Sequence, residues 1–185
     1  MHWRDFLIFS QAATMLEKRL SPTLVEHIEG MKSTAHTDIR KRTIHIDITQ
    51  TEIKCALSYA YELKNLENAE KYLELEKRAK EDEISKSQFV GAVISVEAEA
   101  IYFRCRVIKQ LQNHSQEAIP ANEAYMSIFN DGSSDTQILK NLKRYIIEHG
   151  VVRREIAAKK YYADYYDIIM KKNGLQDQIG ATNKH

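Results

Sequence analysis

The chain contains few of the residues that cross-link or interrupt a fold. Its 185 residues include two Cys, two Pro and six Gly. Cys55 and Cys105 lie far apart in the sequence, so we expect no disulfide framework and take each as a small buried apolar residue. The scarcity of turn residues favours long helices with short connections.

Long apolar segments are also missing. No run approaches the ~18 apolar residues that span a bilayer, and the N-terminus lacks the apolar stretch of a signal peptide. We therefore expect a cytoplasmic protein with no membrane segment. Hydrophobic residues are 43% and charged residues 29% of the chain, a mixture typical of a folded protein. Its length fits a single domain.

Helical spacing of apolar residues dominates the chain. Ser21 and Pro22 together give a helix-start signal, which predicts a short helix over residues 22–30 that ends at Gly30. Asn173 and Gly174 are expected to end the last helix, leaving 175–185 as a frayed tail. The other expected helices span residues 3–20, 53–83 (one bent helix or a hairpin), 88–113, 135–149 and 152–172.

Two segments depart from this pattern. Residues 44–48 alternate apolar and polar side chains, as a strand does, so they are either an extended connector or the partner of a strand that the pattern does not reveal. Residues 113–134 are polar, hold Pro120 and are expected as a mobile loop. The fold class that we predict is an all-α bundle of five to seven helices in one domain, residues 1–174, which allows one short extended segment near residues 44–48.

The helix over 88–113 is the most apolar and is expected to be central. It nevertheless carries two acids and two bases. Glu97, Ile101 and Arg104 share one face of this helix. Two interpretations stay open, a polar site inside the bundle or partly exposed ion pairs with neighbouring helices. The four charged residues are Glu97, Glu99, Arg104 and Arg106.

Positive charge gathers in the C-terminal third. Residues 136–172 hold nine Lys and Arg against four Asp and Glu, a balance of +5. A cationic segment is what phosphate backbones attract, although a solvated helix face or a surface facing an acidic segment has the same composition. The candidate RNA-binding residues are Lys140, Lys143, Arg153, Arg154, Lys159 and Lys160.

The expected last helix also carries a cluster of four tyrosines beside Lys159 and Lys160. Such rings stack on bases in some RNA-binding proteins, and more often line a helix–helix or subunit interface. The four are Tyr161, Tyr162, Tyr165 and Tyr166.

Several kinds of site are not expected. The glycines lie too far apart for a phosphate loop or a dinucleotide fingerprint, and neither the His nor the Cys residues have metal-ligand spacing. The sequence therefore predicts no cofactor and no metal.

One catalytic candidate remains, Arg144 followed by four residues and His149. An imidazole carries protons near neutral pH, and a guanidinium binds phosphate with two hydrogen bonds. Here the chain resembles the HEPN group of small helical bundles, often toxins or antiviral ribonucleases with an R-x(4–6)-H motif. Its Trp3-x-x-Phe6-Leu7 opening is similar to the first helix of some members.

This resemblance implies RNA cleavage without a metal, by attack of the 2′-hydroxyl on the adjacent phosphate. His149 would be the acid and base, Arg144 would hold the phosphate, and two copies of the motif would meet across a homodimer. The alternative is a non-enzymatic adaptor that self-associates or docks a protein partner through its Tyr-rich last helix. Both hypotheses include a homodimer, because the last helices carry more apolar and Tyr residues than one small bundle needs.

Overall fold

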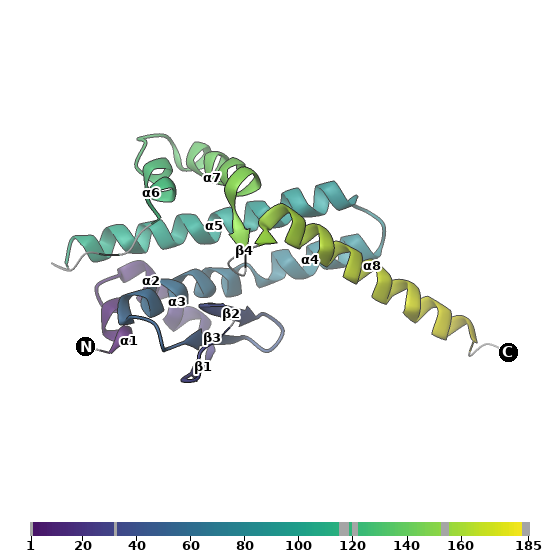
Figure 1. Ribbon diagram of the computed structural model, residues 1–185, viewed down its shortest axis with the longest axis horizontal. Coiled ribbons are helices and arrows are strands. Elements are labelled where there is room, and N and C mark those ends of the chain that lie inside the picture. Colours follow the sequence, from purple (N-terminus) through teal and green to yellow (C-terminus); the bar gives the residue numbers. More distant parts are fainter. Residues whose placement is uncertain (1, 32, 115–118, 120–121, 153–155, 183–185) are drawn as a thin grey trace.

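The fold is mostly helical, with one small sheet near the N-terminus (Figure 1). The computed structural model describes residues 2–31, 33–114, 119, 122–152 and 156–182. Its helices are α1 Trp3–Leu7, α2 Gln11–Leu20, α3 Glu52–Glu67, α4 Ala69–Lys80, α5 Lys86–Gln112, α6 Glu123–Phe129, α7 Asp135–His149 and α8 Ala158–Thr182. Its strands are β1 Thr23–His27, β2 Ala35–Asp38, β3 Thr43–Asp47, β4 Val151–Val152 and β5 Ile156–Ala157.

The three-stranded sheet corrects the all-α prediction. Its order is β1-β3-β2, with β1 parallel and β2 antiparallel to β3. The alternating segment near residues 44–48 is therefore the central strand, and it has partners on both sides. The backbone groups that a lone strand would leave unpaired are thus satisfied.

The helix expected over residues 22–30 is wrong, because β1 occupies this segment. Ser21 is the left-handed C-cap of α2, with φ 44° and ψ 57°, and does not cap a new helix. Pro22, which has no amide hydrogen, then leads the chain into an extended conformation. Leu24 pairs with Ile44 across the sheet, so pairing with residues about twenty positions away determines the extended conformation of this segment.

Other helix boundaries also differ from the expected ones. The helix expected over residues 3–20 is two helices, because Ser10 caps a new one and accepts a hydrogen bond from the Ala13 amide at 3.2 Å. The segment 53–83 divides at Asn68 into α3 and α4. The last helix begins at Ala158 and passes through Asn173 and Gly174 to Thr182.

The loop expected over 113–134 contains α6, a short helix that Asn122 caps through its side-chain oxygen. Residues 115–118 and 120–121, including Pro120, lie outside the described residues. The prediction of mobility for this segment stays a prediction.

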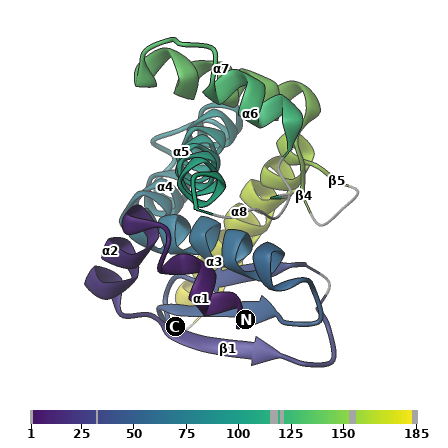
Figure 2. The same cartoon turned by 90° about the vertical axis from the view of Figure 1, so that its left-hand side faces the viewer.

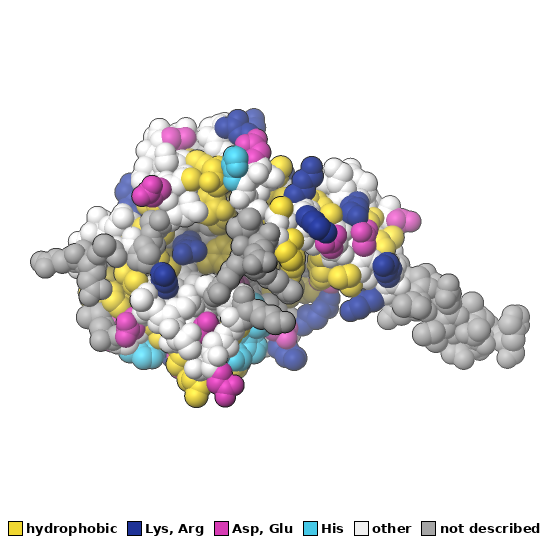
Figure 3. Space-filling model, in the orientation of Figure 1, with side chains coloured by type: hydrophobic (Ala, Val, Ile, Leu, Met, Phe, Trp, Pro, Cys, Tyr) yellow, Lys and Arg dark blue, Asp and Glu magenta, His cyan; other side chains and the backbone are white. Residues whose placement is uncertain are grey.

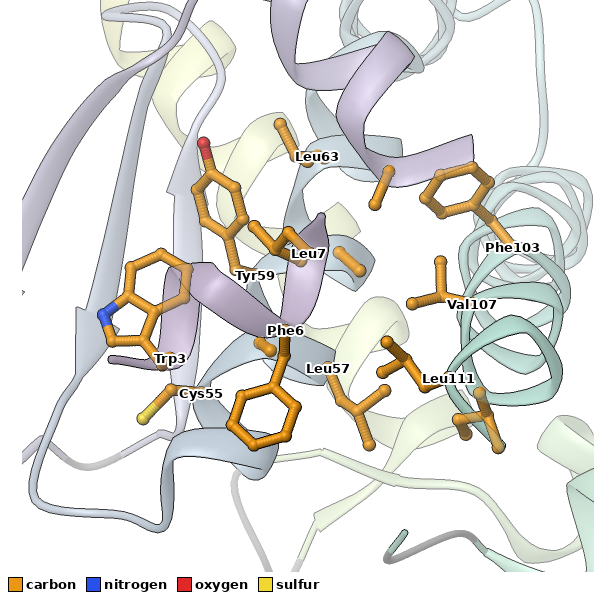
Figure 4. Packing of buried hydrophobic residues seen from close by; sticks show 14 of the residues in the cluster. Trp3, Phe6, Leu7, Cys55, Leu57, Tyr59, Leu63, Phe103, Val107 and Leu111 are labelled. Atoms are coloured by element: carbon orange, nitrogen blue, oxygen red, sulfur yellow. The ribbon is translucent and has the colours of Figure 1, made fainter. Parts of the chain in front are cut away.

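The molecule is layered around α5. The sheet lies on one side of α3, α5 lies on the other, and α6 and α7 cover the far side of α5 (Figure 2). Residues of α1 and α3 pack against the C-terminal half of α5, which supplies Phe103, Val107 and Leu111 (Figure 4). A second apolar cluster joins the N-terminal half of α5 to α7 and α8. Both cysteines are buried free thiols, as expected.

Candidate functional site

The candidate pair Arg144 and His149 lies on α7. Ser134 caps this helix, and Ile138, Leu142 and Ile146 form its buried stripe. Arg144 and His149 are both exposed. Residues five apart on an α-helix point about 140° away from each other, and no hydrogen bond, ion pair or ring contact joins these two in the described part of the chain. One copy of the chain therefore does not bring them together.

His149 is positioned by its aromatic neighbour. Its ring centroid lies 4.8 Å from that of Tyr145, which meets Tyr125 of α6 edge to face at 5.3 Å. His149 Nε2 also lies 3.7 Å from a carboxylate oxygen of Glu148. The imidazole thus stands at the exposed C-terminal end of α7, supported by two tyrosine rings.

The candidate cations do not form one patch. Lys140 is exposed, and Lys143 is half-buried over Gly91 of α5. Lys159 and Lys160 are exposed at the start of α8, where Lys160 pairs with Asp164 at 2.8 Å. Arg153 and Arg154 lie outside the described residues. In the space-filling view, basic and acidic side chains alternate over the α8 end of the molecule (Figure 3).

The tyrosines of α8 face the interior. Tyr162 donates to Glu97 at 2.5 Å, Tyr165 to Glu76 at 2.6 Å and Tyr166 to the Ile84 carbonyl at 3.3 Å. All four tyrosines belong to the second apolar cluster or pack against it. These side chains are therefore already used in contacts within the fold.

Glu97 is the centre of a polar site that the sequence indicated only in part. Three tyrosine hydroxyls donate to its carboxylate, Tyr61 of α3, Tyr72 of α4 at 3.0 Å and Tyr162 of α8 at 2.5 Å. Burial, followed by the nearby Glu97 charge, raises the pKa of each of these tyrosines well above 10. The hydroxyls therefore stay protonated and serve as donors.

A small cavity adjoins this carboxylate. Its volume is about 40 Å³, enough for a few water molecules. It is lined by Tyr61, Glu97, Ile101, Tyr125, Ile146, Gly150, Ala158 and Tyr162. Gly150 directly follows His149, so the cavity ends near the exposed end of α7.

Arg104 lies two turns further along the same face of α5. It lines a second cavity of about 30 Å³, which shares Ile101 and Tyr125 with the first. Burial lowers the pKa of Arg104, and its electrostatic neighbours are Tyr61, Cys105 and Tyr125. Within the described ranges no carboxylate pairs with this guanidinium.

The other charged residues of α5 behave differently. Glu99 forms an ion pair with Lys71 of α4 at 2.5 Å, as the ion-pair interpretation expects. Arg106 is exposed. Of these four residues, Glu97 lines the first cavity and Arg104 lines the second. The spacing of seven residues between Glu97 and Arg104 was the signal in the sequence. The sequence singled out Tyr162 as part of a tyrosine cluster, but nothing in it linked Glu97 to the three tyrosines, which come from three other helices.

A buried acid that the sequence analysis did not single out lies on α3. Glu62 accepts hydrogen bonds from Thr37 of β2 at 2.7 Å and from Asn65 at 3.2 Å. Burial raises the pKa of its carboxyl group to about 7, against the lowering effect of these two hydrogen bonds. Glu62 therefore exchanges a proton near neutral pH.

Metal-ligand groups and membrane-spanning helices are both lacking among the residues that the structure describes. No group of three His, Cys, Asp or Glu side chains there is placed to hold a metal ion. His27, His36 and His45 come close on the outer face of the sheet, where His27 Nε2 lies 3.0 Å from His45 Nδ1 and the His36 and His45 rings stack. None of the described helices is long and apolar enough to cross a bilayer.

Comparisons with known proteins give no further guidance. No family model, no curated protein and no solved structure matches the chain.

Proposed function

We propose that this protein binds single-stranded RNA on α7 and cleaves it when two copies meet, as in the HEPN group that it resembles. We call Lys140, Lys143, Arg144, Tyr145 and His149 the α7 surface; helical spacing puts the three cations on one side of α7 and the two rings on another, so a bound RNA strand would pass around the helix to meet both. One observation carries the proposal: the Tyr145 and His149 rings contact each other at 4.8 Å at the exposed end of a helix rich in cations. Aromatic rings beside cations stack bases while the cations meet phosphates.

The cations of the α7 surface are available to a ligand. Lys140, Lys143 and Arg144 take part in no ion pair within the described residues. Many other basic side chains are already paired with acids, among them Arg4, Arg19, Arg40, Lys64, Lys71, Lys86 and Lys160. A phosphate that reaches α7 therefore does not compete with an internal carboxylate.

Cleavage requires a second copy of the chain. Arg144 and His149 point apart in one protomer, so the guanidinium that binds a phosphate and the imidazole that moves the proton come from different copies. The 2′-oxygen forms a bond to phosphorus and the bond to the 5′-oxygen breaks. One imidazole accepts the proton of the 2′-hydroxyl and a second delivers a proton to the 5′-oxygen.

Binding is tested by fluorescence anisotropy with a labelled single-stranded RNA over a range of salt concentrations. Each phosphate contact adds about 0.7 to the slope of log affinity against log salt, so Lys140→Gln and Arg144→Gln should each weaken binding and reduce the slope by about that amount. Lys41→Gln, which removes an exposed lysine paired with Asp38, is the matched control and should bind as the wild type does. Equal binding by all four proteins would contradict the proposal.

Cleavage is tested on the same RNA in EDTA, which removes metal-dependent contaminants. The wild type should give products ending in a cyclic 2′,3′-phosphate, whereas Arg144→Ala and His149→Ala should give none. Cleavage by both variants at the rate of the wild type would remove the catalytic part of the proposal. Absence of products from the wild type, with binding intact, would leave an RNA-binding protein alone.

A further inference from the structure

Arg104 is a partly buried cation to which the described residues supply no paired anion. It projects from α5, the helix on which Glu97 is held by three tyrosines and Glu99 by Lys71. Its electrostatic neighbours are two tyrosines and the Cys105 thiol, whose pKa burial raises to about 11, and none of these carries a negative charge near neutral pH. A charge removed from water is stable only when it is paired, so this position calls for an anion.

The cavity beside Arg104 offers hydrogen-bond donors to such an anion. Its lining residues are Ile101, Arg104, Cys105, Ile108, Asn122, Tyr125 and Met126, and no carboxylate is among them. The Asn122 side-chain oxygen already accepts from the Ala124 and Tyr125 amides, which leaves its NH₂ group as a donor. Asn122 is exposed, so the cavity is reached from solvent on this side.

We propose that Arg104 and Asn122 bind a phosphate group in this cavity. A guanidinium binds phosphate with two parallel hydrogen bonds, and an amide NH₂ group adds a third donor. At about 30 Å³ the cavity holds only a few water-sized atoms, so a phosphate would enter it with its oxygens foremost and a base or a sugar would stay outside. The phosphate is either a free ion or the phosphate of an RNA, and the two sources are separated by experiment.

The position of the cavity connects it to the α7 surface. Tyr125 lines both cavities and contacts Tyr145, which in turn contacts His149. An RNA on the α7 surface thus has a route along Tyr125 to Arg104. The phosphate site itself does not depend on RNA binding, so it stands if the proposed function fails.

The first experiment measures thermal unfolding with inorganic phosphate and with sodium chloride at the same ionic strength. At about ten times its Kd, phosphate should raise the Tm of the wild type by about 3–6 °C above the chloride sample. Arg104→Gln should lose this rise and keep a phosphate-free Tm at or above that of the wild type, because it removes an unpaired charge. If Arg104 had only a structural role, its replacement by Gln would lower the phosphate-free Tm. Arg106→Gln, exposed on the same helix, is the matched control and should respond as the wild type does.

Arg104→Lys keeps the charge but not the two parallel hydrogen bonds, so its phosphate response should be reduced. Equal responses to phosphate and chloride in the wild type, or equal responses in Arg104→Gln and the wild type, would overturn the inference. The source of the phosphate is then decided with a short RNA prepared with and without a 5′-phosphate. Tighter binding of the 5′-phosphorylated form, lost in Arg104→Gln, identifies a terminal RNA phosphate. Equal binding of both forms, unchanged in Arg104→Gln, identifies the free ion.

Discussion

Glu62 couples the stability of the fold to pH. Burial raises the pKa of its carboxyl group from 4.5 to about 7 in the folded chain. The folded state therefore favours the protonated form. The stability that protonated Glu62 adds is fully present below the unfolded pKa of 4.5 and is lost as the pH rises through about 7. The difference between the two pKa values corresponds to a change on the order of 3 kcal/mol in the free energy of unfolding.

We expect the free energy of unfolding of the wild type to fall between about pH 5 and pH 8 by this amount. Glu62→Gln, which has no proton to lose, should show a much flatter dependence over the same range. Glu70→Gln removes an exposed acid from the next helix and should keep the slope of the wild type. Urea unfolding at a series of pH values measures all three, and a slope unchanged in Glu62→Gln would contradict this account of the carboxyl group.

Replacing Tyr162 should also lower the stability of the fold. It donates to the Glu97 carboxylate at 2.5 Å, whereas Tyr166 on the same helix donates to a neutral carbonyl at 3.3 Å. A hydrogen bond to a charged group contributes about 1.5–3 kcal/mol and one to a neutral group about 0.5–1.5 kcal/mol. Tyr162→Phe should therefore destabilise more than Tyr166→Phe in denaturant unfolding. Equal losses would mean that Glu97 gains little from this hydroxyl.

At the scale of the element, the sequence predicted α5 and α7 well, whereas α8 begins and ends later than expected. The bounds of α7 agree with the prediction, and α5 begins two residues before the expected start, because both have a Ser N-cap and a sustained apolar pattern. The sheet was missed because β1 has no clear alternation, and its partner β3 lies about twenty residues further on. The polar site was indicated only by Glu97 and Arg104, since its tyrosines come from distant helices.

Ser21 shows why the start of β1 could not be predicted from its neighbours. The same residue types that begin a helix also end one, and here Ser21 is left-handed, with φ 44°. Glycine adopts this conformation without steric cost. Ser21→Gly should therefore raise the free energy of unfolding by about 0.5–1 kcal/mol.

Ser85 is the matched position for this test. It caps α5 with its side chain, which accepts from the Gln88 amide at 3.3 Å. Ser85→Ala should lower the free energy of unfolding by about 1 kcal/mol. Opposite signs at the two serines, measured as shifts of the urea midpoint, are the expected result. A loss of stability in Ser21→Gly would mean that its hydroxyl, 3.2 Å from the Lys18 carbonyl, outweighs the backbone effect.

For the whole molecule, the proposed function predicts self-association. Ile147 lies on α7 three residues after Arg144 and is 39% exposed, beside the motif that should meet its copy. We expect sedimentation equilibrium to give twice the 21.5 kDa of one chain. Ile147→Asp should shift the equilibrium toward the monomer, whereas Ile28→Asp, at a 77% exposed position after β1, should not. A monomer at micromolar concentration in the wild type would exclude the two-copy mechanism.

The long helix α5 contributes to both apolar clusters, with its C-terminal half in the first and its N-terminal half in the second. Neither cluster is confined to one stretch of chain. If the backbone were cut in the turn at residues 81–85, each piece would carry one side of a shared apolar interface. Neither piece alone would bury its apolar side chains, so recombination of the two would be favoured by the burial of this apolar surface. The turn between α4 and α5 is thus a natural place to divide this protein into complementing fragments, which would report when two attached proteins come together.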